Sequence, residues 1–96
     1  MEAYEGMYKT AKIRVEYESS LKLTLAHINL IINGKLADTV KRTFKEIFEN
    51  YTLQSVIVID GEELVVVAQI KSAGHLVITE PEVYVGNSKI PMIRVS

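Results

Sequence analysis

Cysteine is absent from the 96 residues of this chain. Without thiols the chain has neither disulfides nor thiolate ligands, which excludes zinc ribbons, iron–sulfur clusters and cysteine nucleophiles. Glutamine is scarce beside many Ile, Val, Glu and Lys residues, which is a thermophile-like composition. We expect a cytoplasmic protein, the ordinary location for a chain without disulfides.

The chain also lacks an excess of charge of one sign. Its 11 Lys and Arg residues face 12 Asp and Glu residues, so the formal net charge is −1. Proteins that bind nucleic acid usually carry a basic excess that attracts phosphates. We therefore expect no strong nucleic-acid binding, and any such contact would need a local basic patch.

Long apolar runs are missing as well. The longest, near LVVVA, is far shorter than the roughly 20 residues that a membrane helix needs. The first residues, MEAYEG, do not show the basic and then apolar order of a signal peptide. We expect no membrane contact.

The strongest pattern is a pair of apolar runs within residues 53–70, separated by Asp60-Gly61-Glu62-Glu63. Two runs rich in β-branched residues around an Asp-Gly pair predict a β-hairpin, because Asp and Gly tolerate the positive φ of a tight turn. Both arms are apolar at nearly every position. Both faces of the hairpin therefore need cover.

The residues before this hairpin predict one strand and one contested segment. Residues 1–10 lack a sustained period and are expected to form a loose N-terminal arm, whereas residues 11–18 alternate as a half-exposed strand. Residues 20–33 favour a helix that ends at Asn33-Gly34. The alternative is a strand in which Ile28, Leu30 and Ile32 alternate, with a bulge near Ala26-His27.

Apolar residues recur at helical spacing over 36–51, which predicts a second helix with one apolar face. That face consists of Leu36, Val40, Phe44, Ile47, Phe48 and Tyr51. Beyond the hairpin we expect short strands at 75–79 and 83–85, and an edge segment at 90–95 that contains Pro91.

The predicted fold class is therefore α+β, with residues 11–96 as a single domain. An antiparallel β-meander of four to five strands follows a first strand and the two helices at about 20–33 and 36–51. The expected core residues are Ile13, Val15, Val40, Phe44, Ile47, Phe48, Ile57, Ile59, Val65, Val67 and Ile78.

No combination of residues predicts catalysis. The two histidines, His27 and His75, have no second metal ligand at a usable spacing. Ser72, His75 and Asp60 suggest a triad only on paper, because a nucleophile and its base are recognised by geometry. We therefore predict that the protein is not an enzyme and has no catalytic residues, metal site or cofactor.

The number of layers available to cover the two faces of the hairpin predicts an oligomer. If one helix covers one face of the hairpin, the other face still needs apolar cover, and an exposed patch of that size marks an interface. A homodimer is favoured because self-association usually gives two-fold symmetry; a subunit of a hetero-complex is the alternative. The interface candidates are Tyr4, Met7, Tyr8, Val56, Val58, Val65 and Val67. The expected function is that of a small, non-enzymatic binding or structural module that acts through protein–protein contacts.

The charged clusters are most simply interpreted as solvated surface. Asp60, Glu62 and Glu63 at the hairpin tip are expected to form a solvated turn, with binding of a cation or a basic partner as the alternative. The basic residues are expected on a solvated helix face, with anion or nucleic-acid contact as the alternative. Those candidates are Lys35, Lys41, Arg42, Lys45 and Arg94.

Two families resemble parts of this pattern. The order strand, helix, helix, strands resembles the RelE-like ribonuclease toxins, although the apolar hairpin here departs from their basic sheet face, so the resemblance implies the fold without the nuclease chemistry. From Leu36 onward the segments VIVIDGEEL, HLVI and MIRVS resemble an Sm-like protein. That resemblance implies a ring that binds single-stranded RNA, with His75 and Arg94 nearest the RNA-contacting positions.

Overall fold

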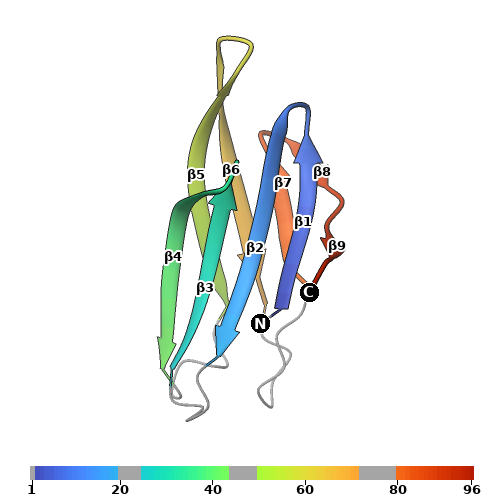
Figure 1. The fold of residues 1–96 in the computed structure, drawn as a ribbon. Helices are drawn as coiled ribbons and strands as arrows, with labels where there is room; N and C mark the ends of the chain where they lie inside the picture. The colour runs from blue at the N-terminus through green and yellow to red at the C-terminus, as the bar shows by residue number, and fades with distance from the viewer. Residues whose placement is uncertain (1, 20–24, 44–49, 72–79) are drawn as a thin grey trace.

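Alternating apolar and polar residues form strands throughout the described part of the chain (Figure 1). The computed structural model describes residues 2–19, 25–43, 50–71 and 80–96. Within these ranges there is no helix, and so none that is long and apolar enough to cross a membrane. The strands are β1 (Glu2–Tyr8), β2 (Ala11–Ser19), β3 (Leu25–Ile32), β4 (Lys35–Thr43), β5 (Tyr51–Ile59), β6 (Glu62–Ile70), β7 (Glu82–Val85), β8 (Ser88–Ile90) and β9 (Ile93–Arg94).

The strands form two antiparallel sheets that pack as two layers. Sheet A has the order β4-β3-β2-β1-β9, and sheet B has the order β5-β6-β7-β8. The chain passes from one sheet to the other between β4 and β5, and again between β8 and β9. Both passages join edge strands, so β4 contacts β5 on one side of the sandwich and β8 contacts β1 on the other.

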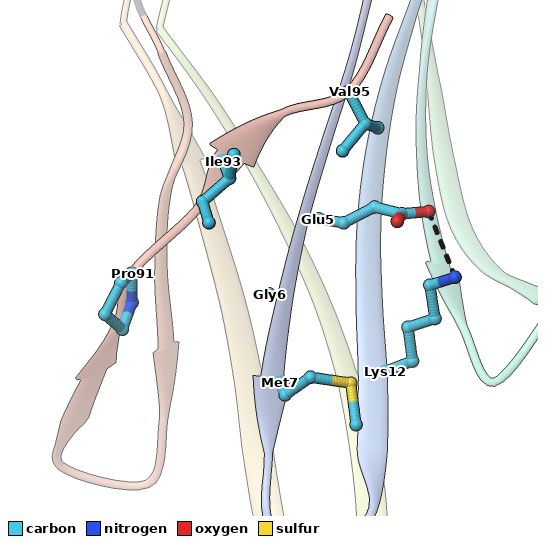
Figure 2. Close-up of a pocket in the computed structure, with 7 residues that line it drawn as sticks. All are labelled: Glu5, Gly6, Met7, Lys12, Pro91, Ile93 and Val95. Atoms are coloured by element: carbon cyan, nitrogen blue, oxygen red, sulfur yellow. Dashed lines mark ion pairs between the residues drawn. The ribbon is translucent and has the colours of Figure 1, made fainter.

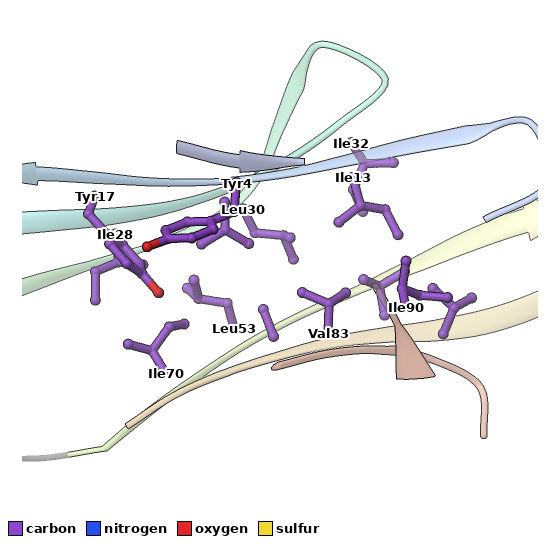
Figure 3. Close-up of a cluster of buried hydrophobic side chains, with 14 residues drawn as sticks. Tyr4, Ile13, Tyr17, Ile28, Leu30, Ile32, Leu53, Ile70, Val83 and Ile90 are labelled. Carbon is purple, nitrogen blue, oxygen red and sulfur yellow. The ribbon is translucent and has the colours of Figure 1, made fainter. Parts of the chain in front are cut away.

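The core lies between the inner faces of the two sheets (Figure 3). Sheet A contributes every second residue of its strands, including Ile13, Val15 and Leu30, all fully buried. The rings of Tyr4 and Tyr17 meet at 5.7 Å between centroids. Sheet B contributes Leu53, Val66, Ala68, Ile70, Val83, Val85 and Ile90.

Tight turns give the hairpins their register. Asn33-Gly34 has φ values of 52° and 80°, and Asp60-Gly61 has 52° and 77°. Two consecutive residues with positive φ form a type I′ turn, whose twist matches that of the strands it joins. The expected hairpin at 53–70 is confirmed, with Ile59 paired to Glu62 across the turn.

Within the described residues neither expected helix is found, so the α+β fold class is wrong and this part of the chain is all-β. Residues 25–32 of the segment 20–33 form β3; residues 20–24 lie outside the described part. Ile28, Leu30 and Ile32 are buried because they alternate along β3, as in the strand alternative. The bulge expected near Ala26-His27 is wrong, because β3 pairs with β2 and β4 there without a shift. Asn33-Gly34 turns the chain into β4 instead of ending a helix.

The segment 36–51 belongs to β4 and β5 at its two ends, and residues 44–49 lie outside the described part. The helical spacing of its apolar residues gave a wrong prediction because the pairing of β3 with β4 shifts between Leu30 and Ile31. Ile31 pairs with Leu36 but Leu30 pairs with Asp38, so Ala37 is the extra residue of a bulge. Leu36 therefore points outward while Val40 packs against the core.

Other expected segments fare differently. The strand at 11–18 and the short strand at 83–85 are confirmed, and Pro91 lies between the edge strands β8 and β9. The N-terminal residues form β1 inside sheet A rather than a loose arm. The strand at 75–79 lies outside the described residues.

Both family resemblances require a helix at 36–51. The described residues of this segment belong to β4 and β5 instead, so neither implied fold is correct.

The expected core is only partly right. Ile13, Val15 and Ile59 are buried, and Val40 and Ile57 pack against the core. Val65 and Val67 lie on the opposite, outer face of β6, because Val66 and Ala68 take the inner positions. Phe44, Ile47, Phe48 and Ile78 lie outside the described part of the chain.

Replacing Leu30 and Leu36 separately with Ala tests the strand assignment. Leu30 is fully buried, so Leu30→Ala is expected to lower the free energy of unfolding by about 2–5 kcal/mol. Leu36 is 62% exposed, so Leu36→Ala is expected to change it by less than about 1 kcal/mol. Urea denaturation measures both values. A loss at Leu36 as large as that at Leu30 would contradict this arrangement of β4.

Candidate functional site

A pocket of about 420 Å³ lies on the outer face of sheet A, beside the C-terminal segment (Figure 2). Its largest apolar side chains, Met7, Ile93 and Val95, are 57%, 69% and 49% exposed. The pocket is lined by Glu5, Gly6, Met7, Lys12, Pro91, Ile93 and Val95. Most of its wall is therefore apolar and open to solvent.

Gly6 allows the C-terminal segment to form one wall of this pocket. A Cβ atom at Gly6 would lie 2.6 Å from the carbonyl oxygen of Pro91 and 2.7 Å from the sulfur of Met92. Real Cβ atoms do not approach other heavy atoms that closely. The missing side chain thus lets residues 90–92 cross β1, after which Ile93 pairs with Glu5.

The charged side of the pocket is an ion-pair network. A Glu5 carboxylate oxygen lies 2.7 Å from the Arg14 guanidinium and 3.4 Å from the Lys12 ammonium, and Arg14 also donates to Glu16 at 2.7 Å. The hydrogen bond from Arg14 lowers the pKa of Glu5 below its ordinary value. The hydrogen bonds to Glu16 and Glu5 raise the pKa of Arg14.

The lowered pKa of Glu5 makes this carboxylate poorly suited to act as a general base. A general base works best with a pKa near the working pH, whereas the pKa of Glu5 is moved away from neutrality. Tyr4 has a raised pKa because it is buried and lies beside Glu2, and its ring belongs to the core. The pocket is suited to holding an apolar group beside a neutralised rim.

Groups suspected of chemistry do not converge. His27 lies half-buried on β3, and His75 and Ser72 lie outside the described part of the chain. Within the described residues, no group of three His, Asp or Glu side chains could hold a metal ion. Asp60 lies 3.8 Å from Lys9, and Glu62 and Glu63 are exposed at the same hairpin tip.

A second candidate surface is the outer face of the β5–β6 hairpin. Val56, Val58 and Val65 are 56%, 66% and 47% exposed, and Val56 pairs directly with Val65. Val67 is half-buried on the same face, where it pairs with Tyr84 of β7. The tip of this hairpin extends past the tips of the other hairpins (Figure 1). The sequence analysis did not name Tyr84 as a residue of this outer face. The apolar residues Val83 and Val85 on either side of it already indicated that they face inward and that Tyr84 faces outward.

The edge of β5 is closed at one point only in the described structure. The backbone N–H of Gln54 donates to Oδ2 of Asp38 on β4 at 2.9 Å, and the N–H of Thr39 donates to Oδ1 of Asp38 at 2.8 Å. Asp38 therefore connects the adjoining edges of sheets A and B. The helix predicted over 36–51 gave no indication of this role.

The expected interface residues separate into three groups. Tyr4 is 4% exposed and Tyr8 packs against the core, so neither presents its ring to a partner. Met7 lies in the pocket. The four valines, Val56, Val58, Val65 and Val67, share the outer face of the hairpin.

The basic candidates do not form one patch. Lys35 pairs with the buried Ile32, whereas Lys41 pairs with His27, so these two lysines occupy opposite faces of β4. Arg94 lies on β9, at the other edge of sheet A, where it contacts Ser96 and lies 4.0 Å from Glu2. Arg42 belongs to β4, and Lys45 lies outside the described residues.

Comparisons with known proteins assign no identity: no family model, no curated protein and no solved structure matches the chain.

A methyl group at position 6 is expected to destabilise the protein. Gly6→Ala forces residues 91–92 away from β1, because the nearest atom, at 2.6 Å, is backbone. We expect a loss of about 1–3 kcal/mol in the free energy of unfolding, the usual cost of overpacking. Met7→Ala, at the exposed neighbour, is the control and should change it by less than about 1 kcal/mol. A Gly6→Ala protein as stable as the original would contradict the close crossing.

Arg14 is expected to control the titration of Glu5. The depressed pKa means that the Glu5 interaction stabilises the fold above the ordinary carboxyl pKa and is lost as the pH falls through the lower, folded-state value. In Arg14→Gln the NMR titration midpoint of Glu5 should rise. Lys41→Gln, on a strand separated from β1 by β2 and β3, should leave it unchanged. An unchanged midpoint in Arg14→Gln would show that Arg14 is not the cause.

Proposed function

We propose that this protein is a small, non-enzymatic module that associates with a second copy of itself through the β5–β6 hairpin. The observation that carries the proposal is the group of exposed valines, Val56, Val58 and Val65, on one face of a projecting hairpin. We keep the cytoplasm as the proposed location.

The position of these valines supports an interface. Single apolar side chains on a surface are ordinary, but a contiguous apolar patch commonly marks a contact with another protein. Here Val56 and Val65 are direct cross-strand neighbours, and Val58 follows Val56 on the same face of β5. Sheet A covers only the inner face of sheet B, so no layer of the described chain covers this outer face.

The charges of the pocket favour a binding role over a catalytic one. Glu5 and Glu16 neutralise Lys12 and Arg14 beside an apolar wall. Such a rim limits non-specific attraction and leaves contacts to depend on shape and apolar area. A protein that acts through protein–protein contacts needs no reactive side chain.

Light scattering and sedimentation of the purified chain test the proposal. We expect a dimer at micromolar concentration, with about twice the 10.8 kDa mass of the chain. Changing Val56, Val58 and Val65 together to Thr keeps the size and β-propensity of the side chains but makes them polar. This variant should weaken association at least tenfold.

Leu36→Thr is the matched control. Leu36 is as exposed as the valines but lies on the outer face of sheet A, so this change should leave the association unaffected. A chain that remains monomeric at high concentration would overturn the proposed function. Equal weakening by the control would show that the hairpin is not the contact.

A further inference from the structure

We infer that two copies pair edge to edge through β5, antiparallel, with Val56 of each copy opposite Val58 of the other. This inference rests on the proposed function and specifies its geometry. The two B sheets would then form one continuous sheet across a two-fold axis at Ile57. The alternative, packing of the two outer faces against each other, makes different residues neighbours.

The hairpin turn determines which backbone groups of β5 are free. In a two-residue hairpin the residues flanking the turn, here Ile59 and Glu62, form a hydrogen-bonded pair, and such pairs alternate with non-hydrogen-bonded ones. The pair of Val56 with Val65 and that of Val58 with Glu63 are therefore non-hydrogen-bonded. The N–H and C=O groups of Val56 and Val58 point away from β6.

The hydrogen bond to Asp38 independently supports this assignment of which β5 backbone groups point away from β6. Gln54 lies two residues before Val56, and its N–H points away from β6 to the Asp38 carboxylate. In the described ranges no group pairs with the N–H of Val56 or of Val58. The free edge thus runs from Val56 to Val58, and unpaired edges of this kind are templates for a further strand.

Only one two-fold register uses both outward-facing residues of this stretch while leaving Gln54 with Asp38. Pairing Val56 with Val58 of the second copy forms four backbone hydrogen bonds, two in each symmetric pair. Ile57 of each copy then faces its mate as a non-hydrogen-bonded pair. The outer valines of the two copies become cross-strand neighbours, which adds apolar contact.

The other edge of the hairpin is less suited to pairing. Val65 accepts a hydrogen bond from the N–H of Gly86, which occupies β6 at that level. Glu63, two residues nearer the turn, is an exposed carboxylate. Charged residues discourage pairing along a sheet edge. The β5 edge has only the apolar residues Val56, Ile57 and Val58 over the same length.

Single cysteines placed in this cysteine-free chain test the register. Opposed residues of a non-hydrogen-bonded pair have Cα atoms about 4.5 Å apart, within the range that a disulfide spans. Ile57→Cys should therefore form a covalent dimer in high yield under mild oxidation. Val65→Cys should not, because two β5 strands separate its two copies, and Leu36→Cys reports random collision. Non-reducing electrophoresis measures the yields, and thermal melting checks that each variant folds.

The outcomes separate the two proposals. Rapid cross-linking of Ile57→Cys alone supports edge pairing. Rapid cross-linking of Val65→Cys, or a dimer by light scattering in which Ile57→Cys reacts no faster than Leu36→Cys, overturns edge pairing and leaves self-association standing. A monomer by light scattering overturns both.

A proline variant covers the case in which Ile57→Cys fails to fold. Val58→Pro removes an N–H that β6 does not use, so the hairpin keeps its internal bonds. We expect the dimer dissociation constant to rise at least tenfold. An unchanged constant in a folded Val58→Pro protein would overturn edge pairing.

Discussion

Neither sheet buries its apolar face without the other, since the inner faces of sheets A and B fill one shared layer. Tyr4, Ile13 and Leu30 from one sheet meet Leu53, Val66 and Val83 from the other. This layer decides the orientation of every described strand. It also decides the exposed surface, because each residue turned inward turns its neighbours outward.

Two devices hold the sheets in place at their sides. On one side the carboxylate oxygens of Asp38 accept hydrogen bonds from the backbone N–H groups of Thr39 on β4 and Gln54 on β5. On the other the chain itself passes from β8 to β9, and it does so beside a residue without a side chain, Gly6. The projecting half of the β5–β6 hairpin lies beyond both devices. Within the described part of the chain, its outer face and edge therefore remain open.

Local patterns succeeded where neighbouring residues decide the structure. The Asp60-Gly61 turn and its hairpin followed from the need for positive φ, and the alternation of 11–18 followed from burial of one face. The segment 36–51 failed because apolar residues at positions 36 and 40 suit a helical turn as well as a strand. The bulge at Ala37, which resolves this ambiguity, depends on pairing with β3 and leaves no local signal.

For the candidate site the same division holds. By itself the sequence determined that both arms of the 53–70 hairpin are apolar, that their turn is tight, and that no thiol chemistry is available. Only the tertiary structure decided that Val66 faces the core while Val65 faces outward, and that the β5 edge is occupied at Gln54. A period of two residues shows that a strand has two faces. Which face is covered depends on strands distant in the chain, because sheet packing is a contact between residues far apart in sequence.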